Sequence, residues 1–197
     1  WEVMRKHPRC AGGFIWMFAD EGVVRTDQNG RIDNVGNYGA DGIVGPHHER
    51  EGSFYTVKQV WSPVQIMDTQ LPDNFDGELQ VENRYDCTNL KDCRFVWTLK
   101  SFNNKESILK SGEIKGLDIA PHMSGTLKLN LPSDWGNADA LYVTAYSPTN
   151  EELWTWVWQW KEAIDFYALL SNKVSLSVNE ENNTLSLSAG STTLTFD

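Results

Sequence analysis

The chain has 197 residues, enough for one large domain or two small ones, each with a hydrophobic core. Its 17 basic and 27 acidic residues give a formal net charge of −10, so its surface repels nucleic-acid phosphates and anionic lipid headgroups. No apolar run approaches the roughly 20 residues that a membrane span requires. We therefore expect neither a nucleic-acid partner nor a membrane partner. The nine tryptophans suit either a large aromatic core or a sugar-binding surface.

Residues 1–61 predict a helix, a buried strand, a long loop and a second helix. The first helix is expected to end before Pro8. Apolar side chains occupy both parities from Phe14 to Ala19, which is typical of a strand buried on both faces in a parallel sheet. Residues 22–42 are rich in Gly and Asn and indicate a loop, and residues 51–61 have the apolar spacing of a helix. A single unit of this kind cannot bury its own strand.

From Val64 onward the pattern changes to short alternating segments separated by turn residues. Seven short strands within about 100 residues are typical of an immunoglobulin-like β-sandwich. After a linker at residues 165–170, a Ser/Thr-rich series predicts strands over 173–178, 184–189 and 192–196, which would open a further β-sandwich. The seven predicted strands are Val64–Met67, Glu78–Tyr85, Arg94–Phe102, Ser107–Ile114, Thr126–Leu131, Leu141–Ser147 and Leu153–Lys161.

Two groups of ionisable residues are candidate sites of chemistry. Asp20 and Glu21 follow the predicted strand, but adjacent strand residues point to opposite faces. They therefore cannot form the pair of carboxyl groups about 5–5.5 Å apart that a retaining glycosidase uses. His47 and His48 diverge in the same way and have no second ligand cluster at metal-binding spacing, so we do not expect zinc there. The sequence has no Gly-x-Ser-x-Gly motif for a serine nucleophile.

The alternating residues Trp154, Trp156, Trp158 and Trp160 fall on one face of the last predicted sandwich strand. One interpretation is a stacking platform for sugar rings. The other is a strand whose tryptophans fill the core or a domain interface, and we favour it because four exposed tryptophans would make a large apolar patch. For Cys87 and Cys93, a bridge across a tight turn and two small buried apolar residues both remain open.

The stretch His7-Pro8-Arg9-Cys10-Ala11-Gly12-Gly13-Phe14-Ile15-Trp16, followed by Asp27-Gln28-Asn29-Gly30, resembles a motif of the glycoside hydrolase family that holds the large bacterial β-galactosidases. Its pattern is Pro-Arg-x-x-Gly-Gly-Phe-[Val/Ile]-Trp with an Asp-x-Asn-Gly turn. Asp41-Gly42-Ile43-Val44 is similar to the family's Asn-Gly-Leu-Val. The resemblance implies that residues 1–61 are the last β/α unit of a catalytic (β/α)8 barrel. It further implies that residues 62–165 are an immunoglobulin-like sandwich and that residues 166–197 begin a terminal β-sandwich, in a mainly β chain.

The resemblance also implies roles for two residues. Trp16 falls on the family tryptophan that packs against the sugar, and an aromatic ring at this place suits stacking on a pyranose. Asp41 falls on an asparagine that touches substrate and a bound sodium ion in the best-known members, so it is a candidate substrate and metal ligand. Asp replaces Asn there, and Met17 replaces the family's Asp, which indicates a divergent subgroup whose sugar need not be galactose.

No residue of this chain falls on the family's two catalytic glutamates, which lie on earlier barrel strands. The chain is therefore expected to be an inactive piece of a retaining exo-glycosidase for terminal β-galactosides or related β-glycosides. Expected partners are the carbohydrate substrate and the rest of the barrel, with Na⁺ or Mg²⁺ as metals of the parent enzyme and a homo-oligomer as its assembly. The compartment stays open between bacterial periplasm and cytoplasm. The alternative is a non-catalytic carbohydrate-binding or structural β-sandwich module.

Overall fold

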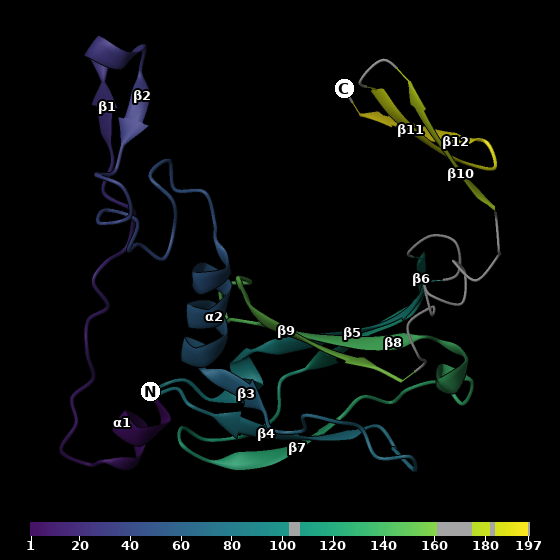
Figure 1. Cartoon of the computed structure of the whole chain (residues 1–197). Coiled ribbons are helices and arrows are strands. Elements are labelled where there is room, and N and C mark those ends of the chain that lie inside the picture. The colour runs from purple at the N-terminus through teal and green to yellow at the C-terminus, as the bar shows by residue number, and fades with distance from the viewer. Residues whose placement is uncertain (103–106, 161–174, 182–183, 197) are drawn as a thin grey trace. The chain divides into compact units, whose positions relative to one another are not determined.

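The computed structural model describes residues 1–102, 107–160, 175–181 and 184–196, in two units, Trp1–Gln159 and Trp160–Asp197. The first unit consists of an N-terminal segment with two helices and a sandwich of two antiparallel sheets (Figure 1). The second unit is a small three-stranded sheet. None of the helices in the described ranges has the length and apolar character needed to cross a bilayer.

The sandwich contains all seven strands that the alternating pattern predicts. Its three-stranded sheet has the order β3-β4-β7, and its four-stranded sheet has the order β6-β5-β8-β9. Every neighbouring pair in both sheets is antiparallel. The strands are β3 (Val64–Ile66), β4 (Glu78–Asn83), β5 (Arg94–Ser101), β6 (Ser107–Lys115), β7 (Ser124–Lys128), β8 (Ala140–Tyr146) and β9 (Glu152–Gln159). Lys161, the predicted last residue of the final strand, lies outside the described residues.

The core of the sandwich follows from the period of two along each strand. In β5 the residues at alternate positions, Phe95, Trp97 and Leu99, are buried, and those between them are partly exposed. Trp97 lies opposite Gly112 on β6, where an added Cβ would stand 2.6 Å from the indole ring. The absence of a side chain at Gly112 therefore gives Trp97 its place in the core.

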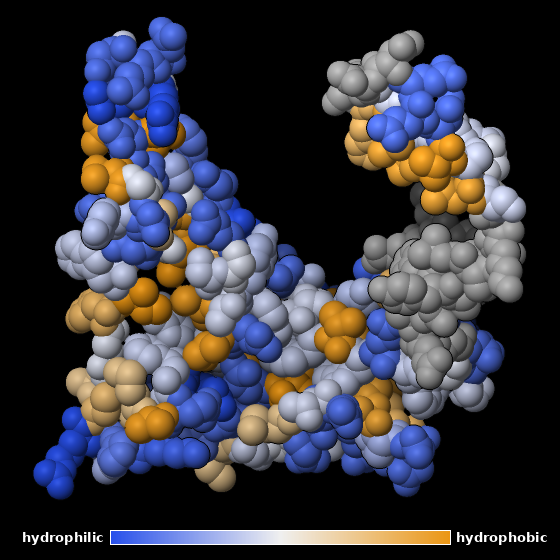
Figure 2. Space-filling model, in the orientation of Figure 1, coloured by the Kyte–Doolittle hydropathy of each residue, from blue (hydrophilic) through white to orange (hydrophobic). Residues whose placement is uncertain are grey.

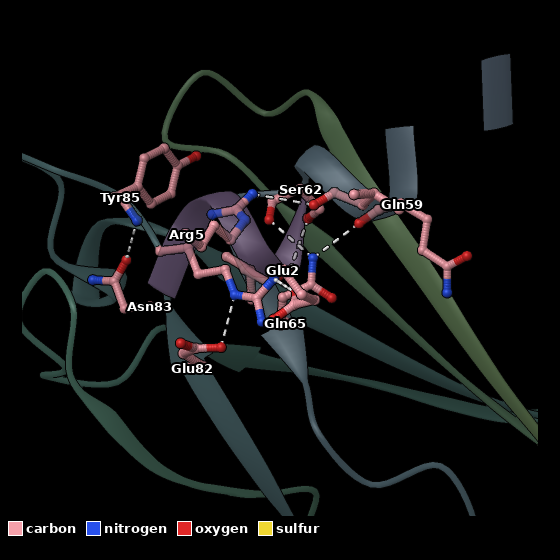
Figure 3. A network of polar contacts seen from close by, with 11 residues as sticks. Glu2, Arg5, Gln59, Ser62, Gln65, Glu82, Asn83 and Tyr85 are labelled. Carbon is pink, nitrogen blue, oxygen red and sulfur yellow. Dashed lines mark hydrogen bonds and ion pairs between the residues drawn. The ribbon is translucent and has the colours of Figure 1, made fainter. Parts of the chain in front are cut away.

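A buried asparagine closes the loops at one end of the three-stranded sheet. Asn83 is fully buried, and its amide nitrogen donates to the carbonyl oxygens of Thr88 and Ile119, each at 2.9 Å. Its side-chain oxygen accepts a hydrogen bond from the backbone N–H of Tyr85 at 3.0 Å (Figure 3). These bonds satisfy both the nitrogen and the oxygen of the buried amide. They join three places in the chain, namely Tyr85 just after β4, Thr88 before β5 and Ile119 before β7.

The N-terminal segment confirms the two predicted helices and corrects the elements between them. The helices are α1 (Glu2–Lys6) and α2 (Gly52–Trp61). Within the predicted loop, a hairpin of β1 (Val23–Arg25) and β2 (Arg31–Asp33), joined through a 3-10 turn at Thr26–Gln28, was missed. Its Asn29-Gly30 pair, in which both residues have positive φ, was the available signal.

The predicted buried strand at residues 14–19 was wrong for this chain. The segment carries no strand, and only Ala19 forms an isolated parallel bridge, with Val44. The side chains of Phe14, Trp16 and Phe18 are 106%, 79% and 59% exposed. A buried parallel strand needs sheet neighbours on both sides and helices over both faces. The described residues supply only one neighbouring segment, around Val44, so these requirements are not met.

The second unit confirms the predicted Ser/Thr-rich strand series. It comprises β10 (Leu176–Glu181), β11 (Thr184–Ala189) and β12 (Thr192–Phe196) in an antiparallel meander. Residues 173–174 and the predicted linker at 165–170 lie outside the described residues. In the register of the strands, Val178, Leu187 and Leu194 stand side by side on one face, and apolar side chains gather on one side of this sheet (Figure 2).

Candidate functional site

The structure brings the two predicted substrate-binding residues into neighbouring segments. The backbone N–H of Met17 donates to the carbonyl oxygen of Asp41 at 3.4 Å, and the N–H groups of Ile43 and Val44 both donate to Phe18 O at 3.0 Å. The segments Trp16–Ala19 and Asp41–Val44 therefore run side by side, although more than 20 residues separate them in the chain. The Trp16 side chain is 79% exposed, and Asp41 is exposed as well. Both are accessible to a ligand in this chain.

Asp20 has a structural role that sequence reasoning missed. Its Oδ1 accepts a hydrogen bond from the backbone N–H of Gly42 at 2.8 Å, and its own N–H donates to Val44 O at 2.9 Å. Gly42 is required there because an added Cβ would stand 2.3 Å from Asp20 N. Asp20 thus fixes the pairing of the two segments.

The described residues bring no cluster of ionisable metal ligands to Asp41. Across residues 1–102, 107–160, 175–181 and 184–196, no three His, Cys, Asp or Glu side chains gather in a way that would hold a metal ion. His47 lies in the loop before α2, where its backbone N–H donates to Glu49 Oε2 at 2.8 Å. The acidic residue after His47-His48 therefore orders a turn.

An ion cluster stabilises the β1–β2 hairpin. The Arg25 guanidinium bonds Asp27 at 2.7 Å and Asp33 at 2.8 Å. The hydrogen bond from Arg25 lowers the pKa of Asp27 below its ordinary value. The pKa of Asp33 is also lowered, first by the hydrogen bond from Val35 N–H and then by Arg25. All three charges are at the surface, so we interpret the cluster as a hairpin clamp and not as a catalytic group.

The tryptophan strand β9 belongs to the core at two of its positions. Trp156 and Trp158 are only 8% and 6% exposed and pair across the strands with Val143 and Leu141. The indole N–H of Trp158 donates to the carbonyl oxygen of Asp68 at 2.9 Å, which satisfies its buried polar group. The core interpretation is therefore confirmed for Trp156 and Trp158. Trp154 is half-buried and borders an open groove of about 440 Å³ beside Gln65 and Asp68.

The cysteines are free thiols, so the disulfide alternative was wrong. Cys93 is buried against the sandwich core, and this burial raises the pKa of its thiol to about 11. Cys87 and Cys10 are exposed, so the alternative of two small buried apolar residues is confirmed for Cys93 and was wrong for Cys87.

A polar network at the junction of helices and sandwich was not anticipated from the sequence (Figure 3). Gln65 on β3 donates its side-chain N–H groups to Gln59 O at 2.9 Å and to Ser62 O at 3.0 Å. Arg84, just after β4, pairs with Glu82 at 2.7 Å and with Glu2 of α1 at 3.3 Å. Glu2 lies 82 residues from Arg84, and the partners of Gln65 are backbone carbonyl groups at a helix end, so no residue pattern in the sequence marks these contacts.

These features define an antiparallel β-sandwich joined to an N-terminal segment. That segment exposes an aromatic strip, formed by Phe14, Trp16 and Phe18. Residues 79–158, from β4 to β9, match the family model of β-galactosidase domain 4. The chain is 27% identical over 143 residues to a β-galactosidase of Priestia megaterium, with 67% of this chain and 13% of that protein covered. A β-galactosidase of Oenococcus oeni is 24% identical over 211 residues, with 95% of this chain and 20% of that protein covered. One of Psychromonas ingrahamii is 46% identical over 41 residues, with 21% and 4% covered.

The chain is therefore similar to the β-galactosidases, most specifically over residues 79–158, which match the model of their domain 4. It spans about an eighth to a fifth of the length of the two relatives that it matches over most of its own length. Among solved structures, an exo-chitosanase of Amycolatopsis orientalis matches with a TM-score of 0.39 and 12% identity, covering 76% of this chain and 20% of that one.

Proposed function

We propose that the full-length protein is a retaining exo-glycosidase acting on terminal β-galactosides or related β-glycosides. In this proposal the chain contributes one wall of the sugar pocket, through Trp16 and Asp41, and the sandwich that supports it. The domain 4 match and the β-galactosidase relatives support this proposal. The catalytic acid/base and nucleophile would come from other parts of the protein, since Asp20 is engaged in holding the backbone at Gly42.

The observation that carries the proposal is the exposed aromatic strip beside Asp41–Val44. Phe14, Trp16 and Phe18 are each more than half exposed, and soluble chains rarely present three such neighbours to water. An exposed indole on a segment paired through its backbone with the one that carries Asp41 has the chemistry that binds a pyranose, which needs an apolar platform and hydrogen-bond partners. We propose that the rest of the barrel covers Phe14 and Phe18, and that residues 1–61 form its last β/α unit.

The metals expected of the parent enzyme do not enter this proposal. No group of three His, Cys, Asp or Glu side chains gathers in the described residues, so we build no step on a metal at Asp41. We assign Asp41 to hydrogen bonding with sugar hydroxyls. Its carboxylate accepts such bonds without a metal.

The β-sandwich is proposed as an immunoglobulin-like supporting domain. Its seven strands have the number and antiparallel order of that class, although β6 pairs with β5 and not with the three-stranded sheet. The carbohydrate-binding alternative required an exposed tryptophan platform, and the burial of Trp156 and Trp158 speaks against it. The amphipathic sheet β10-β11-β12 is consistent with the start of a further β-sandwich. A homo-oligomeric parent remains part of the proposal.

Kinetics of the full-length protein with aryl β-galactosides test the pocket assignment. Trp16→Ala should raise KM about tenfold or more and change kcat less, because stacking holds substrate and transition state alike. Trp16→Phe should lie between the two, since it keeps a smaller aromatic face. Tyr55→Ala on α2 removes an aromatic side chain that is 48% exposed and is the matched control, expected to leave KM unchanged. Unaltered KM and kcat in Trp16→Ala would overturn the assignment.

A further inference from the structure

The C-terminal end of α2 is capped by side chains from other elements. The last four carbonyl groups of a helix have no partner within it and must be satisfied from outside. Gln65 on β3 bonds the carbonyl oxygens of Gln59 and Ser62, and Arg5 of α1 donates to Val60 O at 3.2 Å (Figure 3). The sandwich and the first helix thus share the capping of the second helix.

Further contacts fasten the same helix to the sandwich. Lys58 pairs with Glu152 at the start of β9 at 2.7 Å. The Trp61 ring stacks on Trp1 with a centroid distance of 5.2 Å, and the backbone N–H of Arg84 donates to Pro63 O at 2.7 Å. The C-terminal half of α2 is therefore fixed from several directions. The Lys58 pair is largely exposed and is the weaker contribution.

The N-terminal end of α2 is attached to the candidate sugar-binding segment. The hydroxyl of Ser53 donates to Ile43 O at 3.1 Å, and Ile43 N–H in turn donates to Phe18 O at 3.0 Å. The helix has 10 residues, which makes it about 15 Å long. A rigid helix of this length transfers a shift or tilt of its capped end to Ile43, and from there to the strip that carries Trp16.

We propose that Gln65 is a positioning residue, through which the β-sandwich sets the place of Trp16 and Asp41 in the sugar pocket. This inference rests on the proposed function of these two residues. It gives the sandwich a specific role in substrate recognition, exercised through the carbonyl groups of Gln59 and Ser62. Gln65 itself touches no substrate, so its effect must pass through α2 and Ser53.

The test measures KM and kcat of the full-length protein with an aryl β-galactoside. Gln65→Leu removes both donors and should raise KM threefold to tenfold, with kcat changed less. Gln65→Lys supplies an ammonium donor to the same helix-end carbonyls and should restore most of the KM. Gln80→Leu is the matched control, since the Gln80 side chain on β4 donates to Thr126 Oγ1 on β7 at 3.2 Å. Ser53→Ala acts at the other end of the helix and should raise KM in the same direction, also if Gln65→Leu folds poorly.

Combination with Trp16→Ala separates positioning from a structural effect. If Gln65 acts through Trp16, adding Gln65→Leu to Trp16→Ala should raise KM by much less than it does alone. A full independent effect in the double variant overturns the inference, and so does an unchanged KM in both Gln65→Leu and Ser53→Ala. If Trp16→Ala itself leaves KM unaltered, the proposed function of Trp16 fails first, which distinguishes the two failures.

Discussion

Replacing Trp156 with alanine distinguishes a core tryptophan from a sugar platform most directly. Trp156 is 8% exposed and lies on β9, an edge strand of the four-stranded sheet, beside Val143 of β8. Truncating a buried tryptophan removes its transfer free energy and leaves a cavity, at a cost of about 3–5 kcal/mol. A small domain has a total stability of about 5–15 kcal/mol, so Trp156→Ala should remove a large part of it. An exposed tryptophan on a binding platform would cost only about 0.5 kcal/mol.

Urea denaturation followed by tryptophan fluorescence measures this difference. Eight of the nine tryptophans lie in the unit Trp1–Gln159, so the signal reports mainly on the sandwich and the N-terminal segment. With a denaturant slope of about 1–3 kcal/mol per molar urea, the midpoint should fall by roughly 1–5 M. Val157→Ala, at the 50% exposed position next to it on the opposite face, should shift the midpoint by a few tenths of a molar. Equal small shifts in both variants would refute the assignment of Trp156 to the core.

Two further predictions concern ionisable groups. In the native chain at pH 8, two thiols, those of Cys10 and Cys87, should react rapidly with a disulfide reagent. Cys93 should react only on unfolding, because burial raises the pKa of its thiol to about 11. Three rapidly reacting thiols would contradict this prediction. In a carboxyl NMR titration, Arg25→Met should return the pKa of Asp27 to its ordinary value but leave the pKa of Asp33 partly lowered, since Val35 N–H still bonds it. Because the pKa values of Asp27 and Asp33 are lowered in the folded state, the two carboxylates stabilise the hairpin above about pH 4. This stabilisation is lost as the pH falls through the lowered values. If the pKa of Asp27 does not change in Arg25→Met, Arg25 is not the cause of its shift.

The sandwich was predictable because its strands alternate in the sequence as they do in space. Phe95, Trp97 and Leu99 occupy every second position, and their burial needs only neighbours that the same chain supplies. Strand ends were less predictable, since β7 begins at Ser124 and ends at Lys128, whereas the apolar pattern predicted 126–131. Pairing with β4, which starts at the register Glu78–Lys128, sets the end of that strand, and the sequence of one strand does not contain this information.

The polar contacts at the junction could not be predicted for a related reason. Gln65 looks like any half-buried strand residue, and its role appears only when the last turn of α2 is placed beside it. Asp20 was noticed as an acid at the end of a strand, but its partner is the N–H of Gly42, 22 residues away. Sequence patterns report the local demand for burial and turns. They do not report which distant backbone groups a polar side chain satisfies.

The error at residues 14–19 is informative about what the chain requires. Apolar residues on both parities predict burial on two faces, and the structure leaves Phe14, Trp16 and Phe18 in contact with water. Burying a large side chain contributes about 1.5–3 kcal/mol, so three exposed rings represent several kcal/mol of stabilisation that this chain alone does not obtain. The sequence pattern is therefore adapted to surroundings beyond the residues described. A barrel that covers two of these rings and leaves the third facing a sugar would meet that demand, which is the physical reason that Trp16 is the first residue to substitute.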